Sequence, residues 1–337
     1  MKIFSNPQYQ KAIKKIVSSI PIKPGNYLIT GATGLIGSCL IDTLITAKEN
    51  GCNLNIFGLS RNAIKLQNRF DNKINIIAQD ICEPLNINNN FDFIIHAASN
   101  ADPKTYSLYP AETIFTNIIG AKNTLDYCKN TKTRILLTST FEVYGFLKKD
   151  EFSEDDFGVI DYNLIRSCYP ESKRVSELLF RTYHTEYNVN SIIARLPSVY
   201  GPTMAENDSK AHAQFLRNAL KHQDITLKSK GEQKRSYCYV MDVVGAILYI
   251  LFYGTPCEAY NVSNSNSIAT IADVATTIAN LTNTKTIYVT PTENDKKLYN
   301  TPQNSVLKSS KLEKLGWTGF YTLEEGLKET LNILKGM

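Results

Sequence analysis

Near its N-terminal end the chain reads Tyr27-Leu28-Ile29-Thr30-Gly31-Ala32-Thr33-Gly34-Leu35-Ile36-Gly37. A short apolar run that meets a Gly-x-x-Gly-x-x-Gly segment and continues into a helical pattern predicts a strand, a tight turn and a helix. Gly31 permits the turn, Gly34 lets the backbone approach a pyrophosphate, and Gly37 lets the helix pack closely on the strand. The N–H groups at the start of such a helix favour a bound phosphate, so the segment predicts a dinucleotide site; the alternative is an ordinary strand-to-helix connection. The contacts expected from this loop are Gly31, Thr33, Gly34, Leu35, Ile36 and Gly37.

Strand-like and helix-like patterns alternate from this loop to about residue 195. Strands are expected at residues 27–30, 54–59, 74–78, 91–96, 134–139 and 191–195. Helices are expected at residues 7–20, 35–47, 64–69, 111–129 and 169–186. This alternation predicts an α/β fold of the Rossmann type, in which helices cover both faces of a doubly wound parallel sheet.

The rhythm changes beyond Gly201, where shorter elements are separated by Asn- and Ser-rich turns. We therefore expect two domains, as the length of 337 residues also suggests. The first is the Rossmann domain of residues 1–190 and about 238–263, with an extra N-terminal helix. The second is a smaller α/β lobe of residues 191–237 and 264–337, which binds the substrate.

The composition argues against several classes of function. The net charge is +5, but lysines and arginines are scattered between acidic residues, so no basic block predicts a nucleic-acid partner. A small positive excess suits anionic small molecules. The seven cysteines are widely spread and include no Cys-x-x-Cys pair, which argues against a metal site or a disulfide framework. No apolar stretch approaches about 20 residues, so we expect a cytoplasmic protein without a membrane partner.

The segment Tyr169-Pro170-Glu171-Ser172-Lys173 places a phenol and an ammonium group four residues apart, on one face of a helix. A phenol has an ordinary pKa of about 10, and a lysine one turn away stabilises the phenolate and lowers that pKa. The pair predicts removal of a proton from an alcohol, with hydride transfer to a nicotinamide. The alternative is an exposed amphipathic helix.

Polar residues follow the second and third expected strands. An NAD site usually has an acidic residue at the end of the second strand, whereas this chain has Ser60-Arg61. Arg61 can face a ribose phosphate, so the sequence favours NADP over NAD and leaves both open. Asp80, which precedes Ile81, is placed to accept a hydrogen bond from an adenine amino group or, alternatively, to cap a helix.

Further motifs follow in order along the chain. They are Ile95-His96-Ala97-Ala98-Ser99, Thr116-Asn117-Ile118-Ile119-Gly120, Ser139-Thr140-Phe141-Glu142-Val143-Tyr144-Gly145, Arg195 with Tyr200-Gly201-Pro202, and Arg235-Ser236-Tyr237 before Tyr239-Val240-x-Asp242. With these motifs the chain resembles the extended short-chain dehydrogenase/reductase family, the NAD(P)-dependent nucleotide-sugar epimerases, dehydratases and decarboxylases. The resemblance covers nearly all of the sequence after residue 25. Residues 142–145 and 166–174 look most like UDP-glucuronate decarboxylases.

The resemblance implies a role for each matching residue. Tyr169 takes the proton of the sugar hydroxyl, Lys173 lowers the pKa of Tyr169 and binds the nicotinamide ribose, and Thr140 hydrogen-bonds the reacting oxygen. Asn117 supports the site, through water or as a buried polar contact. The segment Ala97, Ala98 and Ser99 lines the cofactor. The implied substrate-binding residues are Ser198, Tyr200 and Arg235, with Arg235 a bidentate donor to the diphosphate or, alternatively, part of a surface salt bridge.

Glu142 is the residue that takes the reaction beyond hydride transfer. Once C4 of the sugar is a ketone, a carboxylate can remove the C5 proton, and the same ketone stabilises the carbanion left when carbon dioxide departs. The alternative is that Glu142 pairs with a base or caps a turn. Phe141 stands where dehydratases have an Asp, which argues against dehydration. Ser198 stands where decarboxylases have an Asn, and Asn300 where they have an Arg that helps to hold a uronate carboxylate.

We therefore expect an enzyme that uses NAD or NADP to oxidise a hydroxyl of a nucleotide-diphosphate sugar to a ketone, followed by epimerisation or decarboxylation and re-reduction. The alternatives are a net NADPH-dependent reductase of a nucleotide-linked keto sugar and a non-catalytic NAD(P)-binding regulator. The resemblance also implies a homodimer through the helices at residues 111–129 and 169–186. Leu178, Leu179 and Phe180 serve either that interface or the core.

Overall fold

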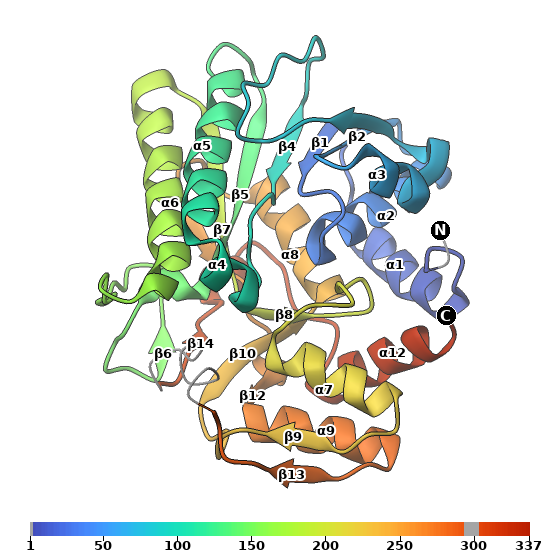
Figure 1. The fold of residues 1–337 in the computed structure, drawn as a ribbon. Helices are drawn as coiled ribbons and strands as arrows, with labels where there is room; N and C mark the ends of the chain where they lie inside the picture. Colours follow the sequence, from blue (N-terminus) through green and yellow to red (C-terminus); the bar gives the residue numbers. More distant parts are fainter. Residues whose placement is uncertain (1–2, 293–302) are drawn as a thin grey trace.

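A parallel sheet forms the centre of the larger domain (Figure 1). The computed structural model describes residues 3–292 and 303–337. Seven strands lie in the order β11-β7-β5-β4-β1-β2-β3, and each neighbouring pair is parallel. They are β1 (Gly25–Thr30), β2 (Leu54–Ser60), β3 (Asn75–Ala78), β4 (Phe93–His96), β5 (Arg134–Thr140), β7 (Asn190–Leu196) and β11 (Ala259–Asn261).

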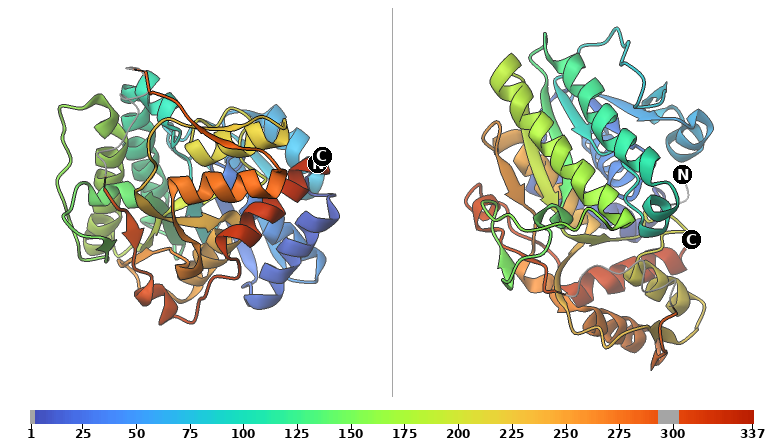
Figure 2. Two further views of the ribbon diagram at one scale, coloured as in Figure 1. Left: turned by 90° about the horizontal axis from the view of Figure 1, so that it is seen from below. Right: turned by 60° about the vertical axis from the view of Figure 1, so that its left-hand side comes forward.

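Helices cover both faces of this sheet, so the predicted doubly wound fold is confirmed (Figures 1 and 2). On one face lie α2 (Leu35–Glu49) and α8 (Val240–Tyr253), with α1 (Pro7–Ser19) packed against both. On the other face α5 (Pro110–Cys128) and α6 (Cys168–Tyr187) pack side by side. The shorter α3 (Ala63–Phe70) contacts β2 and β3, and α4 (Pro103–Leu108) precedes α5.

The chain reverses its direction across the sheet at β1. It moves outward from β1 through β2 to β3, and then continues on the other side of β1 with β4, β5 and β7. In parallel sheets of this kind the carboxyl ends of the two strands at the reversal open into a crevice that binds ligands. Strands β1 and β4 therefore mark where a site is expected.

The second domain packs below the carboxyl ends of these strands, as seen in Figure 1. Its three-stranded sheet has the order β12-β10-β8, with β8 (Ser198–Tyr200), β10 (Lys234–Tyr239) and β12 (Ile268–Thr270). Two smaller sheets pair β9 (Ile225–Leu227) with β13 (Thr286–Tyr288), and β6 (Glu151–Phe152) with β14 (Val306–Leu307). The helices are α7 (Ala211–Leu220), α9 (Ile271–Thr282), α11 (Ser310–Glu313) and α12 (Leu323–Lys335).

One expected domain boundary falls one strand too early. Strand β7 pairs with β5 and β11 in the large sheet, so the chain leaves that sheet after Leu196 and not at residue 190. The pattern at residues 191–195 predicted a strand but carried no information about which sheet that strand would join.

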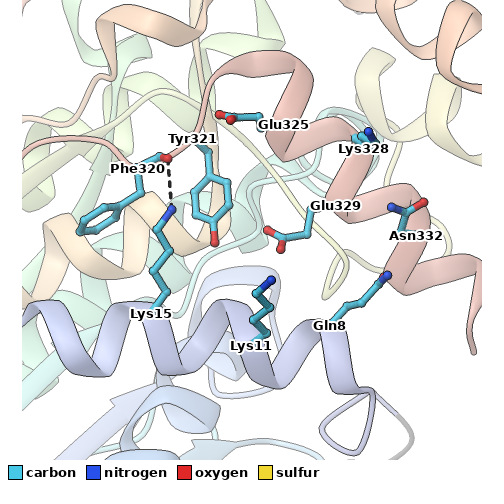
Figure 3. A pocket seen from close by; sticks show the side chains of 9 residues that line it. All are labelled: Gln8, Lys11, Lys15, Phe320, Tyr321, Glu325, Lys328, Glu329 and Asn332. Carbon is cyan, nitrogen blue, oxygen red and sulfur yellow. Dashed lines mark hydrogen bonds between the residues drawn. The ribbon is translucent and has the colours of Figure 1, made fainter.

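Helix α1 connects the two domains on the side away from the crevice. The Tyr9 hydroxyl donates to the Asp42 carboxylate of α2 at 2.7 Å, and Arg69 forms an ion pair with the same carboxylate. Near the other end of α1, the Lys15 ammonium lies 4.2 Å from the centre of the Tyr321 ring. A surface hollow of about 320 Å³ lies between α1 and α12 (Figure 3), and it shares none of the predicted site residues. Lys11 and Glu329 face each other across it.

None of the helices in residues 3–292 and 303–337 combines the length and the apolar character needed to cross a bilayer. All seven cysteines are free thiols.

Candidate active site

The glycine loop joins β1 to α2 as predicted. Gly31 has a φ of +66°, and a Cβ atom at this position would lie 2.6 Å from the Ala97 carbonyl oxygen. A Cβ atom at Gly37 would lie 2.4 Å from the Gly31 carbonyl oxygen. Gly34 is the N-cap of α2, and no side chain caps this helix. The first N–H groups of α2, at Leu35 and after, therefore face the crevice without a side-chain partner, which is what an anion needs.

The loop after β4 forms the other wall of the crevice. The Thr30 hydroxyl oxygen accepts from the N–H groups of Ala97 and Ala98, both at 3.1 Å. Thr30 also hydrogen-bonds the His96 ring at 3.1 Å, and burial lowers the pKa of that histidine to about 3, so its ring is neutral. Ser99 donates to the Asn117 side-chain oxygen at 2.7 Å. The ends of β1 and β4 are thus fixed to each other before any ligand binds.

The end of β2 carries a small charged cluster. The Arg61 guanidinium lies 3.1 Å from the Glu112 carboxylate and 4.0 Å from that of Asp80. Ser60 is half-buried at the strand end. Asp80 accepts a hydrogen bond from the N–H of Cys82 at 2.9 Å, which is a local turn contact. Two carboxylates beside Arg61 make this corner less suited to a ribose phosphate than the sequence indicated, because they repel a further negative charge.

Ile81 is buried against the C-terminal half of α5. Asn123 donates to the Ile81 carbonyl oxygen at 2.9 Å, and the Ile81 side chain lies where a Cβ atom at Gly120 would be, at 3.0 Å. Its side chain thus packs in the core, and only its backbone is placed to contact an adenine.

Tyr169 and Lys173 lie in the first two turns of α6, both buried. The Lys173 ammonium donates to the Thr138 carbonyl oxygen at 3.0 Å. Burial lowers the pKa of Lys173 to about 8, and the Glu177 carboxylate opposes that fall. Burial and then the Glu142 carboxylate raise the pKa of Tyr169, while a hydrogen bond with Thr140 lowers it.

The net effect on the phenol is a rise in pKa, and burial, which penalises a phenolate, is its largest cause. The expectation that Lys173 lowers the pKa of Tyr169 stays a prediction; in this structure the Lys173 ammonium donates to the Thr138 carbonyl oxygen. The Thr140 hydroxyl, which also accepts from the Glu142 N–H at 3.3 Å, is the group that favours the phenolate.

Glu142 forms an ion pair inside the site. Its carboxylate accepts from Arg166 at 3.0 Å, and the two side chains are only 15% and 14% exposed. The same Arg166 nitrogen donates to the Tyr106 hydroxyl at 3.0 Å. The Tyr106 ring stacks on the Tyr169 ring, with 5.1 Å between ring centres and 10° between planes. The Glu142 carboxylate, the Arg166 guanidinium and the two phenols thus form one connected group. The ion pair with Arg166 is the kind of pairing with a base that was the alternative role for Glu142.

Asn117 supports the helix that carries Tyr169. Its side-chain nitrogen donates to the Ser172 hydroxyl at 2.8 Å, and Ser172 in turn donates to the Tyr169 carbonyl oxygen at 2.9 Å. Ser176 donates to the Asn117 carbonyl oxygen at 3.0 Å. These are buried polar contacts of the kind expected for Asn117, and its role in the site stays a prediction.

The three predicted substrate residues lie in different surroundings. Ser198 begins β8 and is half-buried. Tyr200, in contrast, is 1% exposed, and its hydroxyl donates to the Leu323 carbonyl oxygen at 3.3 Å, so its side chain belongs to the core of the second domain. A substrate contact from Tyr200 stays a prediction, and the burial of its side chain does not favour it. Arg235 in β10 has a buried Nε atom without a hydrogen-bond partner among the described residues, which is consistent with an anion-binding role and not with the surface salt bridge.

Comparison with known proteins adds an independent observation. The sequence model of the NAD dependent epimerase/dehydratase family matches residues 27–263. The chain belongs to this family.

Several relatives within the family share one activity, the decarboxylation of UDP-glucuronic acid, in their names. UDP-glucuronic acid decarboxylase 6 of Arabidopsis thaliana is 34% identical over 309 residues, which cover 89% of this chain and 86% of the relative. UDP-glucuronic acid decarboxylase 1 of Xenopus tropicalis is 31% identical over 312 residues, covering 91% and 72%.

Solved structures of similar fold are more distant in sequence. UDP-glucose 4-epimerase of Thermotoga maritima has a TM-score of 0.77 at 24% identity, and the match covers 91% of this chain and 98% of that one. UDP-glucuronic acid 4-epimerase of Bacillus cereus, in complex with UDP-glucuronic acid and NAD, has a TM-score of 0.76 at 22% identity, covering 92% and 99%. These likenesses show that the fold is that of the epimerase/dehydratase family.

The residues of this family member fit a nicotinamide dinucleotide. Backbone packs so closely at Gly31 and Gly37 that no Cβ atom fits there, which holds the loop in its tight turn, and α2 has no capping side chain. Gly31, Gly34 and the following N–H groups would hold the diphosphate, and Lys173 would reach the ribose near Tyr169.

Sequence reasoning missed two residues of the site. Arg166 did have a sequence signal. It stands three residues before Tyr169, a spacing that can bring two side chains together within one helical turn. Tyr106 had no signal, because nothing in the pattern at residues 103–108 predicted the short helix α4 that brings it onto Tyr169. Gln303 donates to the Gly145 carbonyl oxygen at 2.6 Å and thereby holds the loop that follows Glu142. Asn300 lies outside the described residues.

Proposed function

We propose that this protein decarboxylates UDP-glucuronate through a keto intermediate. The observation that carries the proposal is the connected group of Glu142, Arg166, Tyr106 and Tyr169, which places a guanidinium beside the base that takes the proton of the sugar hydroxyl. The UDP-glucuronic acid decarboxylases, at more than 30% identity over most of the chain, support the same substrate.

The residues divide the reaction between them. Tyr169 accepts the proton of the C4 hydroxyl, and Thr140 hydrogen-bonds the same oxygen. Bound near Tyr169 and Lys173, a nicotinamide would supply the acceptor for the hydride of the sugar and would return that hydride at the end. The C5 to carboxylate bond then breaks, carbon dioxide leaves, and its electron pair passes into the ketone. Arg166 holds the substrate carboxylate before this step, and Glu142 controls the proton that C5 gains afterwards.

The charges at the adenosine end support NAD as the cofactor. Glu112 and Asp80 flank Arg61, so its charge is already compensated and a ribose phosphate would meet two carboxylates. A net reductase would consume NADPH, whereas an epimerase or decarboxylase recycles NAD. A site suited to NAD therefore argues against the alternative reductase.

One observation favours a second candidate, the epimerisation of a UDP-sugar at C4. Asn300 replaces the Arg that the decarboxylase motif carries, and an epimerase needs no cation to hold a leaving carboxylate. Removal of the hydroxyl proton by Tyr169, with the hydride going to a nicotinamide and returning to the other face of the ketone, would complete that reaction.

A turnover assay separates these functions. The purified protein is incubated with NAD and UDP-glucuronate, UDP-glucose or UDP-N-acetylglucosamine, and the products are analysed by mass spectrometry and near-ultraviolet absorbance. Loss of one carbon dioxide supports the proposal, and an unchanged mass with a new sugar stereochemistry supports epimerisation. Steady consumption of NADPH with a keto sugar would indicate the reductase. If no product formed with any sugar, the hypothesis that the protein is a nucleotide-sugar enzyme would be refuted, and a non-catalytic NAD(P)-binding regulator would be favoured.

A homodimer and a cytoplasmic location complete the proposal. Phe115 of α5 and Leu178 of α6 are 57% and 60% exposed, whereas Leu179 is half-buried and Phe180 is in the core. Large exposed apolar side chains on two adjacent helices are consistent with burial against a second copy. Seven free thiols suit a reducing compartment. Light scattering on the protein and its Leu178→Asp variant tests the dimer, which the variant should weaken.

A further inference from the structure

The segment between β8 and α7 touches the larger domain at two separate points. The Thr203 hydroxyl donates to the Leu35 carbonyl oxygen at 2.8 Å, in the first turn of α2. Six residues later, the N–H and the hydroxyl of Ser209 both donate to one oxygen of the Asp102 carboxylate at 2.7 Å. Residues 203–209 are called the strap below.

Asp102 is a firm anchor for one end of the strap. Its second carboxylate oxygen accepts from the N–H and the hydroxyl of Thr105, at 3.0 and 3.1 Å, and so caps α4. The Lys104 N–H donates to the Ser209 hydroxyl at 3.1 Å. Burial raises the pKa of Asp102, but the hydrogen bonds from Ser209 and Thr105 outweigh that effect and the pKa is lowered. The carboxylate is therefore charged at neutral pH, and charged acceptors form the stronger hydrogen bonds.

The two ends of the strap stand on opposite sides of the dinucleotide crevice. Leu35 belongs to the β1 side, directly after the glycine loop, and Asp102 belongs to the loop that leaves β4. Between them, Gly31 and Ala97 approach so closely that they form the floor of the crevice. In Figure 1 the strap runs between the larger domain and α7. It therefore crosses the crevice at the point where the chain reverses across the sheet.

We propose that the strap retains the dinucleotide, which enters or leaves only when the contacts of Asp102 with Ser209 and of Thr203 with Leu35 open. The inference rests on the proposed function only in that the crevice takes a nicotinamide dinucleotide. It adds a structural cause for slow release of the cofactor, namely the two contacts that hold the strap on the larger domain. Such retention suits a reaction that returns its hydride, and it opposes the net reductase, which must exchange NADP for NADPH in every cycle.

Dissociation of NADH measures this directly. Protein loaded with NADH is mixed with a large excess of NAD, and the loss of bound-NADH fluorescence gives the dissociation rate. Asp102→Ala should raise that rate at least tenfold, and Thr203→Val, which removes a single hydrogen bond, severalfold. The matched control is Asp224→Ala, because Asp224 accepts from the Lys285 N–H at 3.0 Å and joins two segments of the second domain in the same way, away from the crevice.

Each outcome has a distinct meaning. A dissociation rate within twofold of the wild-type value in both strap variants, with unchanged thermal unfolding, would overturn the strap while leaving the proposed function intact. A faster rate in Asp224→Ala as well would overturn it too, because the effect would then be general loosening. Failure of the wild-type protein to bind NADH at all would refute the dinucleotide site and hence the proposed function. If Asp102→Ala does not fold, Thr203→Val alone decides between these results.

Discussion

Replacement of Lys173 by methionine tests how much the buried charge of Lys173 lowers the stability of the folded protein. The ammonium group is buried, with 2% of the residue exposed, and it donates a hydrogen bond to the Thr138 carbonyl oxygen. Burial lowers the pKa of Lys173 from 10.5 to about 8, against the opposing effect of Glu177. A fall of roughly 2.5 in pKa corresponds to about 3 kcal/mol between the charged and neutral forms.

The sign of the effect on stability follows from the two protonation states. Below pH 8 the lysine is charged in both the folded and the unfolded chain, so the folded state bears the whole cost of the buried charge. As the pH rises from 8 toward about 10.4, the folded lysine loses its proton before the unfolded one does, and the cost disappears. The free energy of unfolding of the wild type should therefore rise by about 3 kcal/mol relative to that of Lys173→Met between pH 7 and pH ~10.

Urea unfolding of both proteins at several pH values measures this difference. Methionine has a similar length, so packing changes little, and every other titrating group is shared and cancels in the comparison. The lost hydrogen bond to Thr138 shifts the whole curve without adding a slope. A difference that stays constant within about 0.5 kcal/mol over this range would show that the site does not penalise the charge of Lys173, and the reasoning from burial would be wrong.

Three further predictions concern other parts of the site. Tyr169→Phe should lower turnover about 10²- to 10⁴-fold without changing NADH binding by fluorescence, because only the proton acceptor is lost; near-full activity would remove Tyr169 from the mechanism. Arg166→Gln leaves the Glu142 carboxylate without its ion-pair partner and should lower the free energy of unfolding in urea by about 2 kcal/mol, whereas an unchanged midpoint would make this ion pair dispensable. Gly37→Ala places a Cβ atom 2.4 Å from a carbonyl oxygen and should lower the free energy of unfolding by about 3 kcal/mol, measured by thermal unfolding. The control is Gly245→Ala, whose Cβ atom would have its nearest neighbours at 3.5 Å and which should change stability by less than about 1 kcal/mol. Equal effects of the two alanines would contradict the steric argument.

Local patterns in the sequence predicted the larger domain well. The expected helix at residues 35–47 is observed as Leu35–Glu49, and the strand at residues 134–139 as Arg134–Thr140. These elements follow from apolar periodicity and from the glycine loop, which act over a few residues. The side of the sheet that each element joins is a long-range property, and this is why the boundary at residue 190 fell before β7.

The residue types of the site were predictable where a sequence motif indicates the chemistry. Their burial and their contacts were not, because tertiary packing decides them. The spacing of Tyr169 and Lys173 correctly placed both side chains in the same helix. It could not indicate their burial, which is the largest cause of the rise in the pKa of Tyr169. The burial of Tyr200 was unpredictable for a similar reason, because its motif carries no information about the core of the second domain, into which its side chain packs.

The position of α1 has a consequence for where this protein can be shortened. The region shared with the family begins at residue 27, yet Tyr9, Ile13 and Ile16 of α1 are completely buried against the rest of the chain. A polypeptide trimmed to the shared region would uncover this apolar surface and deprive the buried Asp42 of the Tyr9 hydroxyl. It would also lose α12, which packs on α1 from the other domain. The limits of homology and the limits of an autonomous folding unit therefore differ in this chain, and truncation at residues 27 and 263 should yield an unfolded product.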